Sequence, residues 1–261
     1  MKQVFRVPAI FCIFILLAGC ATTQQDTITQ YSFIDAILAG AYDGQEKCSK
    51  ILEHGDMGIG TFDGLDGEMV VLDRQIYQVK YDGSVVTPGP EETTPFACVA
   101  EFLPDKAVNI IPGTDLKGLM HVTDLAVPNQ NIFLAVKATG TFSTMLTRSV
   151  PEQTKPYPPL VEVTKNQSQF HMKNVKGTVV GFRTPPYAKG IGVPGYHLHF
   201  LSDDKTQGGH ILALTFEQGA VEIDLCNRFV LINPKDESGL KDMDFSKDRT
   251  HELEQAEKKH E

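Results

Sequence analysis

Two histidines one residue apart constrain this chain more than any other feature of its sequence. His197 and His199 alternate with Tyr196, Leu198 and Phe200. This period of two residues predicts a β-strand. Residues i and i+2 of a strand point to the same face, so we expect both imidazoles to leave one face together.

The segment that follows predicts a hairpin. Gln207-Gly208-Gly209 is a turn signal, and His210 opens a probable second strand over residues 211–214. The turn would place His210 opposite the histidine pair. Three neutral imidazoles that converge around an open position are the arrangement of a catalytic zinc. The alternative is three unrelated histidines in a hairpin.

Composition limits the class of protein and its partners. The chain has 261 residues, of which 41% are hydrophobic and 22% charged, which argues against disorder and against a coiled coil. The formal net charge of −9, without a basic block, argues against a nucleic-acid partner. An acidic protein that acts on a small anion needs a local cation in its site, which directs attention to single arginines.

The first twenty residues predict a signal peptide rather than part of the fold. Lys2 and Arg6 precede an apolar run over residues 7–17, which is too short to span a bilayer. The run leads to Cys20, in a sequence that resembles a bacterial lipoprotein box. We expect lipidation at Cys20, with residues 21–30 as a polar tether and an uncleaved anchor helix as the alternative.

This start also predicts where the protein is located. An exported lipoprotein would contact the membrane only through its anchor, so we expect an outer-membrane lipoprotein facing the periplasm, or a secreted protein. The sequence leaves the oligomeric state open, with a homodimer as one expectation. Three further cysteines, an odd number, allow at most one disulfide: Cys48, Cys98 and Cys226.

Most of the remaining patterns predict strands. A hairpin is expected over residues 69–81, closed by Asp73-Arg74. Residues 55–68, rich in Gly and Asp, are expected to form tight turns. Further strands are expected at residues 96–102, 131–146 with a break at Gly140, 177–182, 211–216 and 221–225. Helices are expected at residues 31–42, at residues 115–125, and after Ser246 through Glu257.

These elements predict an α+β fold. It would have two mainly-β subdomains of mixed or antiparallel sheet, a few flanking helices and a C-terminal helix. A Pro-rich link at residues 150–159 suggests the boundary between them. We therefore expect an N-terminal subdomain over residues 31–150, and a metal-binding subdomain with the terminal helix over residues 151–261.

Several further segments stand out along the chain: GTFDGLDGE at 60–68, RSVPEQ at 148–153, KPYP at 155–158, GTVVGF at 177–182, VPGYHLHF at 193–200 and GGH at 208–210. Together, and in the same order, they resemble the alpha-acetolactate decarboxylase family. The similarity extends from about residue 31 to residue 257.

The resemblance implies an enzyme that converts 2-acetolactate, a small anion, to acetoin and carbon dioxide. It implies a zinc ion held by His197, His199 and His210. Glu68 and Glu257 match the two family glutamates at the metal.

Arg148 matches the active-site arginine of the family. The tail of the chain leaves Glu254 as a competitor for the role of Glu257.

The chemistry of the substrate agrees with this implication. Acetolactate is a β-keto acid, so loss of carbon dioxide leaves an electron pair that must enter the ketone as an enolate. A zinc ion that chelates the ketone and the neighbouring hydroxyl would stabilise this enediolate, and no organic cofactor is needed. Glu68 is the candidate proton donor, which requires a raised pKa. Arg148 would either hold the departing carboxylate or face the enediolate oxygen.

Two other functions fit parts of the sequence. A cupin-like metal enzyme also combines a glycine-rich segment, a His-x-His pair and a later histidine, with Asp203 as its acidic ligand. Such an enzyme has no use for the segment around Glu68. A non-enzymatic lipoprotein that binds a metal or a solute would keep the histidines but gain nothing from Arg148.

Overall fold

β-Strands are the main secondary structure of the protein, whose computed structural model describes residues 25–235 and 239–257. A seven-stranded sheet has the order β14 (Arg228–Ile232), β1 (Thr27–Tyr31), β8 (Ala97–Ala100), β3 (Met57–Thr61), β4 (Glu68–Leu72), β5 (Gln75–Val79) and β6 (Val85–Val86). A five-stranded sheet has the order β10 (Phe133–Ser149), β11 (Ser168–Thr184), β12 (Gly195–Ser202), β13 (Gly208–Cys226) and β9 (Lys106–Ile110). The strands β2 (Glu46–Lys47) and β7 (Thr93–Thr94) form a small separate sheet.

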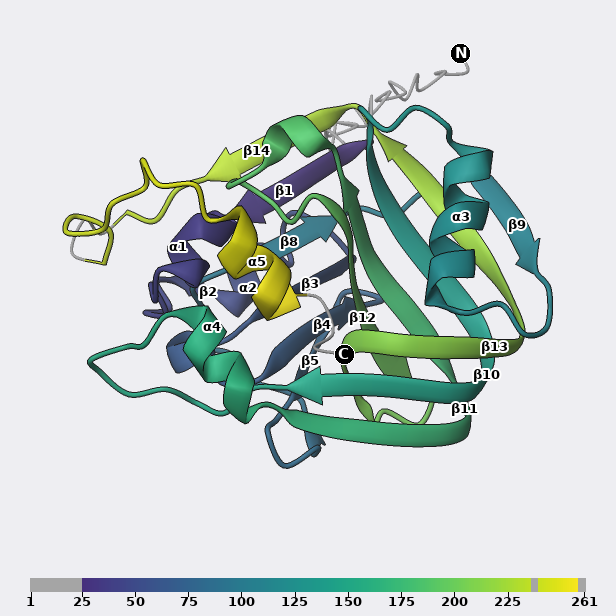
Figure 1. The fold of residues 1–261 in the computed structure, drawn as a ribbon, viewed down its shortest axis with the longest axis horizontal. Coiled ribbons are helices and arrows are strands. Elements are labelled where there is room, and N and C mark those ends of the chain that lie inside the picture. The colour runs from purple at the N-terminus through teal and green to yellow at the C-terminus, as the bar shows by residue number, and fades with distance from the viewer. Residues whose placement is uncertain (1–24, 236–238, 258–261) are drawn as a thin grey trace, which may run out of the picture.

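The five-stranded sheet curls back on itself. Strand β10 pairs with both β11 and β13, and the long strands curve around a common interior in Figure 1. The helices α1 (Ile34–Leu38), α4 (Leu160–Val163) and α5 (Thr250–Glu257) gather where the two sheets meet, whereas α3 (Leu116–Ala126) lies beside β9. The short α2 (Cys48–Ile51) follows β2.

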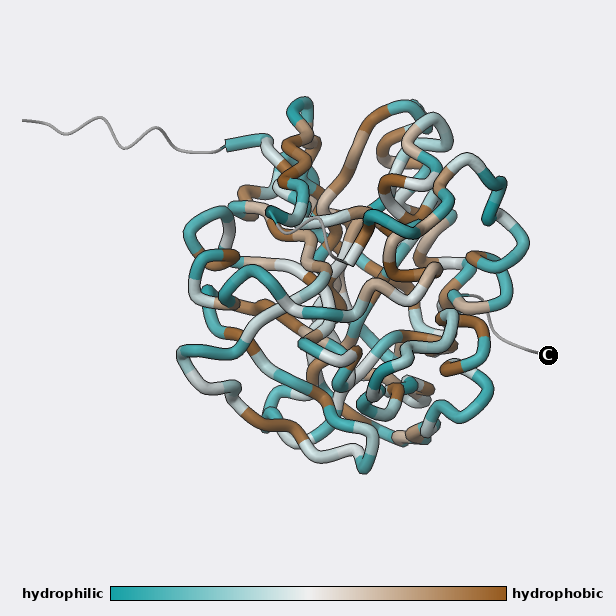
Figure 2. Tube along the Cα trace, turned by 90° about the vertical axis from the view of Figure 1, so that its left-hand side faces the viewer, coloured by the Kyte–Doolittle hydropathy of each residue, from teal (hydrophilic) through white to brown (hydrophobic). Residues whose placement is uncertain are grey.

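Apolar side chains from both sheets fill the interior. Hydrophilic segments occupy most of the outer turns in Figure 2, while hydrophobic segments run through the body of the molecule. The fold is thus the expected α+β class with mostly antiparallel pairing. Among residues 25–235 and 239–257, no helix combines the length and apolarity needed to span a membrane.

Several expected elements form where the sequence placed them. Asp73 and Arg74 adopt positive φ angles of 52° and 60°, the backbone of a tight turn that joins β4 to β5. The Asp115 side chain caps α3 by accepting a hydrogen bond from the backbone N–H of Gly118 at 2.7 Å. The last helix begins later than expected, because Asp248 rather than Ser246 accepts from the Thr250 N–H.

The expected tether is wrong from Thr27 onward. Residues 27–31 form the buried strand β1, held between β14 and β8. The polar composition of residues 27–30 suggested an exposed segment. Polar side chains of this strand can nevertheless be buried, because they find hydrogen-bond partners inside the protein. The Gln30 amide, for example, donates to the carbonyl oxygens of Ser32 and Ile191 at 2.8 and 2.7 Å. The predicted signal peptide and Cys20 lie outside the described residues.

The expected subdomain boundary near residue 150 is also wrong. Strand β10 lies before this point and β11 after it, yet they pair along almost their whole length. In the other sheet, β14 from the end of the chain pairs with β1 from its beginning. The Pro-rich segment is a loop between neighbouring strands, and its composition carries no information about pairing between distant segments.

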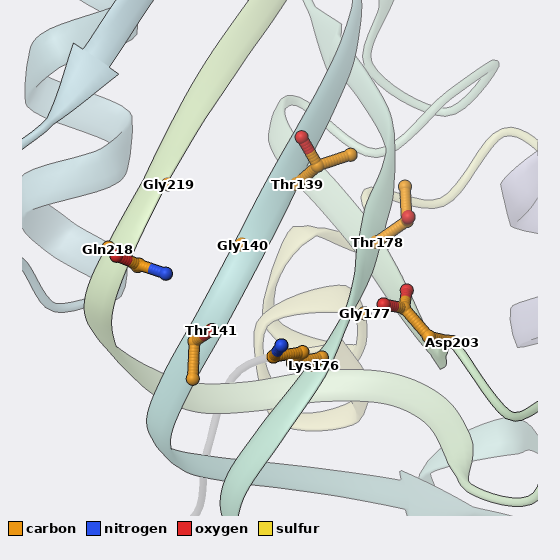
Figure 3. A pocket seen from close by; sticks show the side chains of 9 residues that line it. All are labelled: Thr139, Gly140, Thr141, Lys176, Gly177, Thr178, Asp203, Gln218 and Gly219. Carbon is orange, nitrogen blue, oxygen red and sulfur yellow. The ribbon is translucent and has the colours of Figure 1, made fainter.

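A row of three glycines lets the five-stranded sheet bend. Gly140 lies opposite both Gly177 and Gly219, as Figure 3 shows. A Cβ atom at Gly177 would lie 2.5 Å from the ring of Phe200, and one at Gly219 would lie 2.9 Å from the ring of Phe216. A Cβ atom at Gly140 would lie 2.2 Å from the carbonyl oxygen of Gln218, so the predicted break is instead a close approach of backbones within a continuous β10.

Two further expectations are corrected, one on the glycine-rich segment before Glu68 and one on the cysteines. Residues 57–61 are a buried strand, so tight turns are confined to the stretch just before Glu68. The three cysteines in the described part of the chain are all buried and free, so the one disulfide that the sequence allowed does not form.

Candidate metal centre and active site

The predicted hairpin brings the three histidines together. His197 and His199 lie on β12, and His210 lies directly opposite His199 on β13. Their ring centroids are 5.1 to 5.3 Å apart. One nitrogen from each ring lies within 4.8 Å of the other two, which is close enough to hold one metal ion.

A glycine allows this close approach. Gly209 precedes His210 and has a φ angle of +122°, which side-chain-bearing residues rarely adopt. A Cβ atom there would lie 2.4 Å from the carbonyl oxygen of Arg148. The turn before His210 therefore requires glycine both for its conformation and for the space beside β10.

Two buried glutamates from distant elements complete the cluster. Glu68 opens β4, and its Oε2 lies 3.6 Å from Nε2 of His199. Glu257 ends α5, and its Oε2 lies 3.4 Å from Nε2 of His197 and 3.7 Å from Nδ1 of His210. Glu254 lines a neighbouring cleft, whereas Glu257 also lines the inner cavity at the histidines. Glu257 is therefore the tail carboxylate of the cluster.

The free donor atoms fit a metal ion. Nε2 of His199, Nδ1 of His210 and Oε2 of Glu257 are buried and find no hydrogen-bond partner within the described part of the chain. Nδ1 of His199 lies 2.8 Å from the Met69 carbonyl oxygen and so donates to it, which leaves the Nε2 lone pair free to bind metal. Imidazole nitrogens with carboxylate oxygens suit zinc well.

Electrostatics also favours metal binding. Burial, and to a smaller extent the charge of Arg148, lowers the pKa of His197 to about 3. Burial holds the pKa values of His199 and His210 well below their usual range. All three imidazoles are therefore neutral at physiological pH, which is the form that binds a metal.

Arg148 lies between the two glutamates. It projects from β10, opposite His210 in the strand register. One terminal nitrogen lies 3.3 Å from Oε1 of Glu68, and the other lies 3.7 Å from Oε1 of Glu257. Burial raises the pKa of Glu68 to about 7, although the Arg148 charge opposes this rise. Burial likewise raises the pKa of Glu257.

Two spaces adjoin these groups. An inner cavity of about 40 Å³ touches Glu68, Arg148, His197, His199 and Glu257. Its remaining wall is mostly apolar: Ile34, Ile37, Leu65, Phe96, Val150 and Leu160. An outer cleft of about 960 Å³ reaches His210 and Glu257 from the side of α3 and α5. The inner cavity can therefore present charged groups to one part of a small ligand and apolar groups to another.

Sequence reasoning identified the polar members of this site and missed the apolar ones. Ile34 and Ile37 come from α1 and Leu160 from α4, and nothing in their local sequence distinguishes them from ordinary core residues. Asp203, the acidic ligand of the cupin-like alternative, lies at a separate cavity beside the glycine row (Figure 3) and not with the histidines.

Comparison with known proteins agrees with this geometry. The pattern of the family described as alpha-acetolactate decarboxylase matches residues 28–247. The chain belongs to the alpha-acetolactate decarboxylase family. Membership makes it an enzyme of the carboxy-lyase class. Glu257 lies beyond the matched residues, so its place in the site rests on the structure.

Relatives in this family resemble the chain over most of its length. The alpha-acetolactate decarboxylase of Methanosarcina mazei is 45% identical over 84% of this chain and 76% of its own. That of Methylococcus capsulatus is 39% identical over 90% of both chains. A crystal structure of alpha-acetolactate decarboxylase from Bacillus subtilis strain 168 superposes with a TM-score of 0.86 at 34% identity, covering 89% of this chain and 100% of that one.

Proposed function

We propose that this enzyme decarboxylates 2-acetolactate to acetoin and carbon dioxide, with zinc held at the three histidines. The observation that carries the proposal is the set of unpartnered donor atoms on His199, His210 and Glu257, beside an arginine and a small cavity. Family membership supports the reaction. His197, His199 and His210 would hold the ion, with Glu68 and Glu257 as further candidate ligands.

The chemistry divides between the ion and the protein. Bound zinc would act as a Lewis acid toward the ketone and hydroxyl oxygens of the substrate, where charge develops as carbon dioxide leaves. Arg148 supplies the fixed positive charge that an anionic substrate needs in an acidic protein. Its planar fork suits a carboxylate or a pair of neighbouring oxygens.

Glu68 is the proposed proton donor. After loss of carbon dioxide, the carbon that carried the carboxylate must receive a proton to give acetoin. Burial raises the pKa of Glu68 to about 7 in the metal-free protein, which favours a carboxyl that can hold a proton near neutral pH and also release it. Because Glu68 approaches from one side of the cavity on β4, it would deliver the proton to one face and yield a single enantiomer.

The apolar wall would bind the rest of the substrate. Acetolactate carries two methyl groups, and Leu65, Val150 and Leu160 offer apolar surface opposite the charged groups. The same side chains limit the access of water, so that Glu68 rather than solvent supplies the proton.

A direct assay tests this proposal. Purified protein is mixed with acetolactate, and acetoin is measured with and without a chelator, followed by zinc readdition. We expect acetoin formation that is lost with the chelator and restored by zinc. Absence of acetoin from a zinc-loaded, folded sample would contradict the proposed reaction. Full activity in a sample shown by elemental analysis to lack metal would contradict the zinc requirement.

The sequence also supports a proposal about location. The segment that ends at Cys20 motivates export and lipidation, with the catalytic domain tethered at the outer membrane or secreted. The homodimer remains a prediction from the sequence.

A further inference from the structure

Two buried hydroxyl groups flank Arg148 on β10. Thr147 and Ser149 are both fully buried, with a relative exposure of 0%. Neighbouring residues of a strand alternate in direction, so both hydroxyls leave β10 on the side opposite to the Arg148 side chain. One donates a hydrogen bond to the backbone of β13, which carries His210, and the other to the backbone of β5, which pairs with the strand that carries Glu68.

Thr147 joins β10 to the histidine hairpin. Its hydroxyl donates to the carbonyl oxygen of Gly208 at 2.6 Å. Gly208 opens β13 two residues before His210. A Cβ atom at Gly209 would lie 3.3 Å from Cβ of Thr147, so the turn is packed tightly against this side chain. The bond therefore fixes the start of β13 relative to Arg148.

Ser149 joins β10 to the strand pair that carries Glu68. Its hydroxyl donates to the carbonyl oxygen of Val79 at 2.8 Å. Val79 lies directly opposite Glu68 in the β4–β5 pairing. Glu68 and Val79 belong to the seven-stranded sheet, whereas Arg148 belongs to the five-stranded sheet. No ladder of backbone hydrogen bonds joins β10 to β5 among the described strands, so this bond crosses between the sheets.

We infer that Thr147 and Ser149 are positioning residues for the proposed reaction. The Ser149 hydroxyl holds Arg148 in register with Glu68, and the Thr147 hydroxyl holds it in register with His210. The inference rests on the function proposed above. An error of about 1 Å in the placement of a reacting group can cost roughly 100-fold in rate, so a single bond between two sheets can matter.

The experiment compares paired variants of each residue. Ser149→Ala and Thr147→Val remove a hydroxyl, whereas Ser149→Thr and Thr147→Ser keep one. Thr141→Val is the matched control, because Thr141 lies on the same strand but lines the cavity of Figure 3, away from the histidines. Each variant is assayed for kcat, KM, thermal midpoint and the zinc affinity of the metal-free protein, measured by competition with a chelator.

The two hydroxyls should affect different quantities. Ser149→Ala should lower kcat roughly tenfold and leave zinc affinity unchanged, because it loosens Arg148 against Glu68 but not the histidine hairpin. Thr147→Val should lower zinc affinity roughly tenfold, as expected for a residue that supports a metal ligand. Ser149→Thr and Thr147→Ser should recover most of each loss, and Thr141→Val should change neither quantity.

Other outcomes would overturn the inference. If Ser149→Ala keeps the wild-type kcat, or if Thr141→Val loses as much kcat, the Ser149 hydroxyl has no positioning role and forms only an ordinary buried hydrogen bond. If Ser149→Ala does not fold, Ser149→Cys replaces the hydroxyl by a slightly larger and weaker donor and must still lower kcat. If the wild-type protein makes no acetoin, the proposed function itself is wrong. If Thr147→Val binds zinc with wild-type affinity, the positioning role of Thr147 is disproved, whatever the result for Ser149.

Discussion

The Arg148 guanidinium lies 3.3 Å from the Glu68 carboxylate, although the two residues are 80 positions apart and lie in different sheets. Their closeness makes each residue part of the electrostatic environment of the other. Burial raises the pKa of Glu68 to about 7 in the metal-free protein, against the opposing charge of Arg148. The pair therefore combines a fixed cation with an exchangeable proton in one small cavity.

Removal of any histidine of the cluster should abolish zinc binding and activity together. His197→Ala, His199→Ala and His210→Ala each leave two imidazoles, too few for the expected site. We expect zinc affinity to fall by more than about 100-fold, beyond the range seen when only the support of a ligand is disturbed. Elemental analysis of the folded variants measures this, with His121→Ala as a control. A variant with a full equivalent of zinc and a normal rate would show that its histidine is not a ligand.

Replacement of Glu68 by glutamine should separate binding from turnover. Glu68→Gln keeps the size of the side chain but removes the proton donor, so KM should change little while kcat falls by about 100-fold or more. The acetoin that still forms should lose optical purity, because water would then protonate either face. Chiral chromatography of the product tests this. A normal rate with fully chiral product would exclude Glu68 as the donor.

Replacement of Arg148 by lysine should act mainly on binding. Arg148→Lys keeps the charge and loses the planar fork that can hold a carboxylate through two hydrogen bonds. If Arg148 orients the departing carboxylate, KM should rise by at least the factor by which kcat falls, each by about tenfold. Steady-state kinetics with wild-type zinc content provides the measurement. A loss confined to kcat would instead place Arg148 at the enediolate oxygen.

A buried aspartate outside the site should make stability depend on pH. Asp224 is fully buried, and Leu103 donates a backbone hydrogen bond to its Oδ2, while Oδ1 finds no partner within the described part of the chain. Burial raises the pKa of Asp224 from 3.8 to about 6. A raised carboxyl pKa means that the folded protein binds the proton more tightly than the unfolded chain does.

The contribution of Asp224 is thus fully present below about pH 4 and is lost as pH rises through about 6. Asp224→Asn cannot ionise, so its stability relative to wild type should improve by about 1 kcal/mol or more between these limits. Urea denaturation of metal-free samples across this range gives the difference. A constant offset between the two proteins would contradict the assignment to Asp224.

The convergence of the three histidines could be predicted because these residues lie in a local pattern, whereas Glu68, Arg148 and Glu257 were expected only from the family resemblance. The alternation around His197 and the turn before His210 are readable over about fifteen residues, and both were confirmed. The turn at Asp73 was readable for the same reason. The strand at Thr27 and the strand pairing across residue 150 could not be predicted, because both depend on partner strands far along the chain.

Removal of the cysteine at the predicted lipidation site should change location but not catalysis. Cys20→Ser would prevent attachment of acyl chains, each CH₂ of which contributes about 0.8 kcal/mol of membrane binding. We expect the variant to accumulate as an unprocessed precursor or to leave the membrane, with unchanged kcat. Fractionation with mass spectrometry measures both. A wild-type protein found wholly soluble at its precursor mass would disprove the lipid anchor.

The position of Glu257 at the end of α5 makes the site depend on a short helix far along the chain from the other polar groups. Glu68, Arg148 and all three histidines lie on strands that precede α5. Until this helix docks, the cluster lacks one of its two carboxylates and the wall that Glu257 adds to the inner cavity. Cleavage of the chain before Thr250 would therefore remove a carboxylate from the metal centre while leaving in place the strands that carry Arg148 and the histidines.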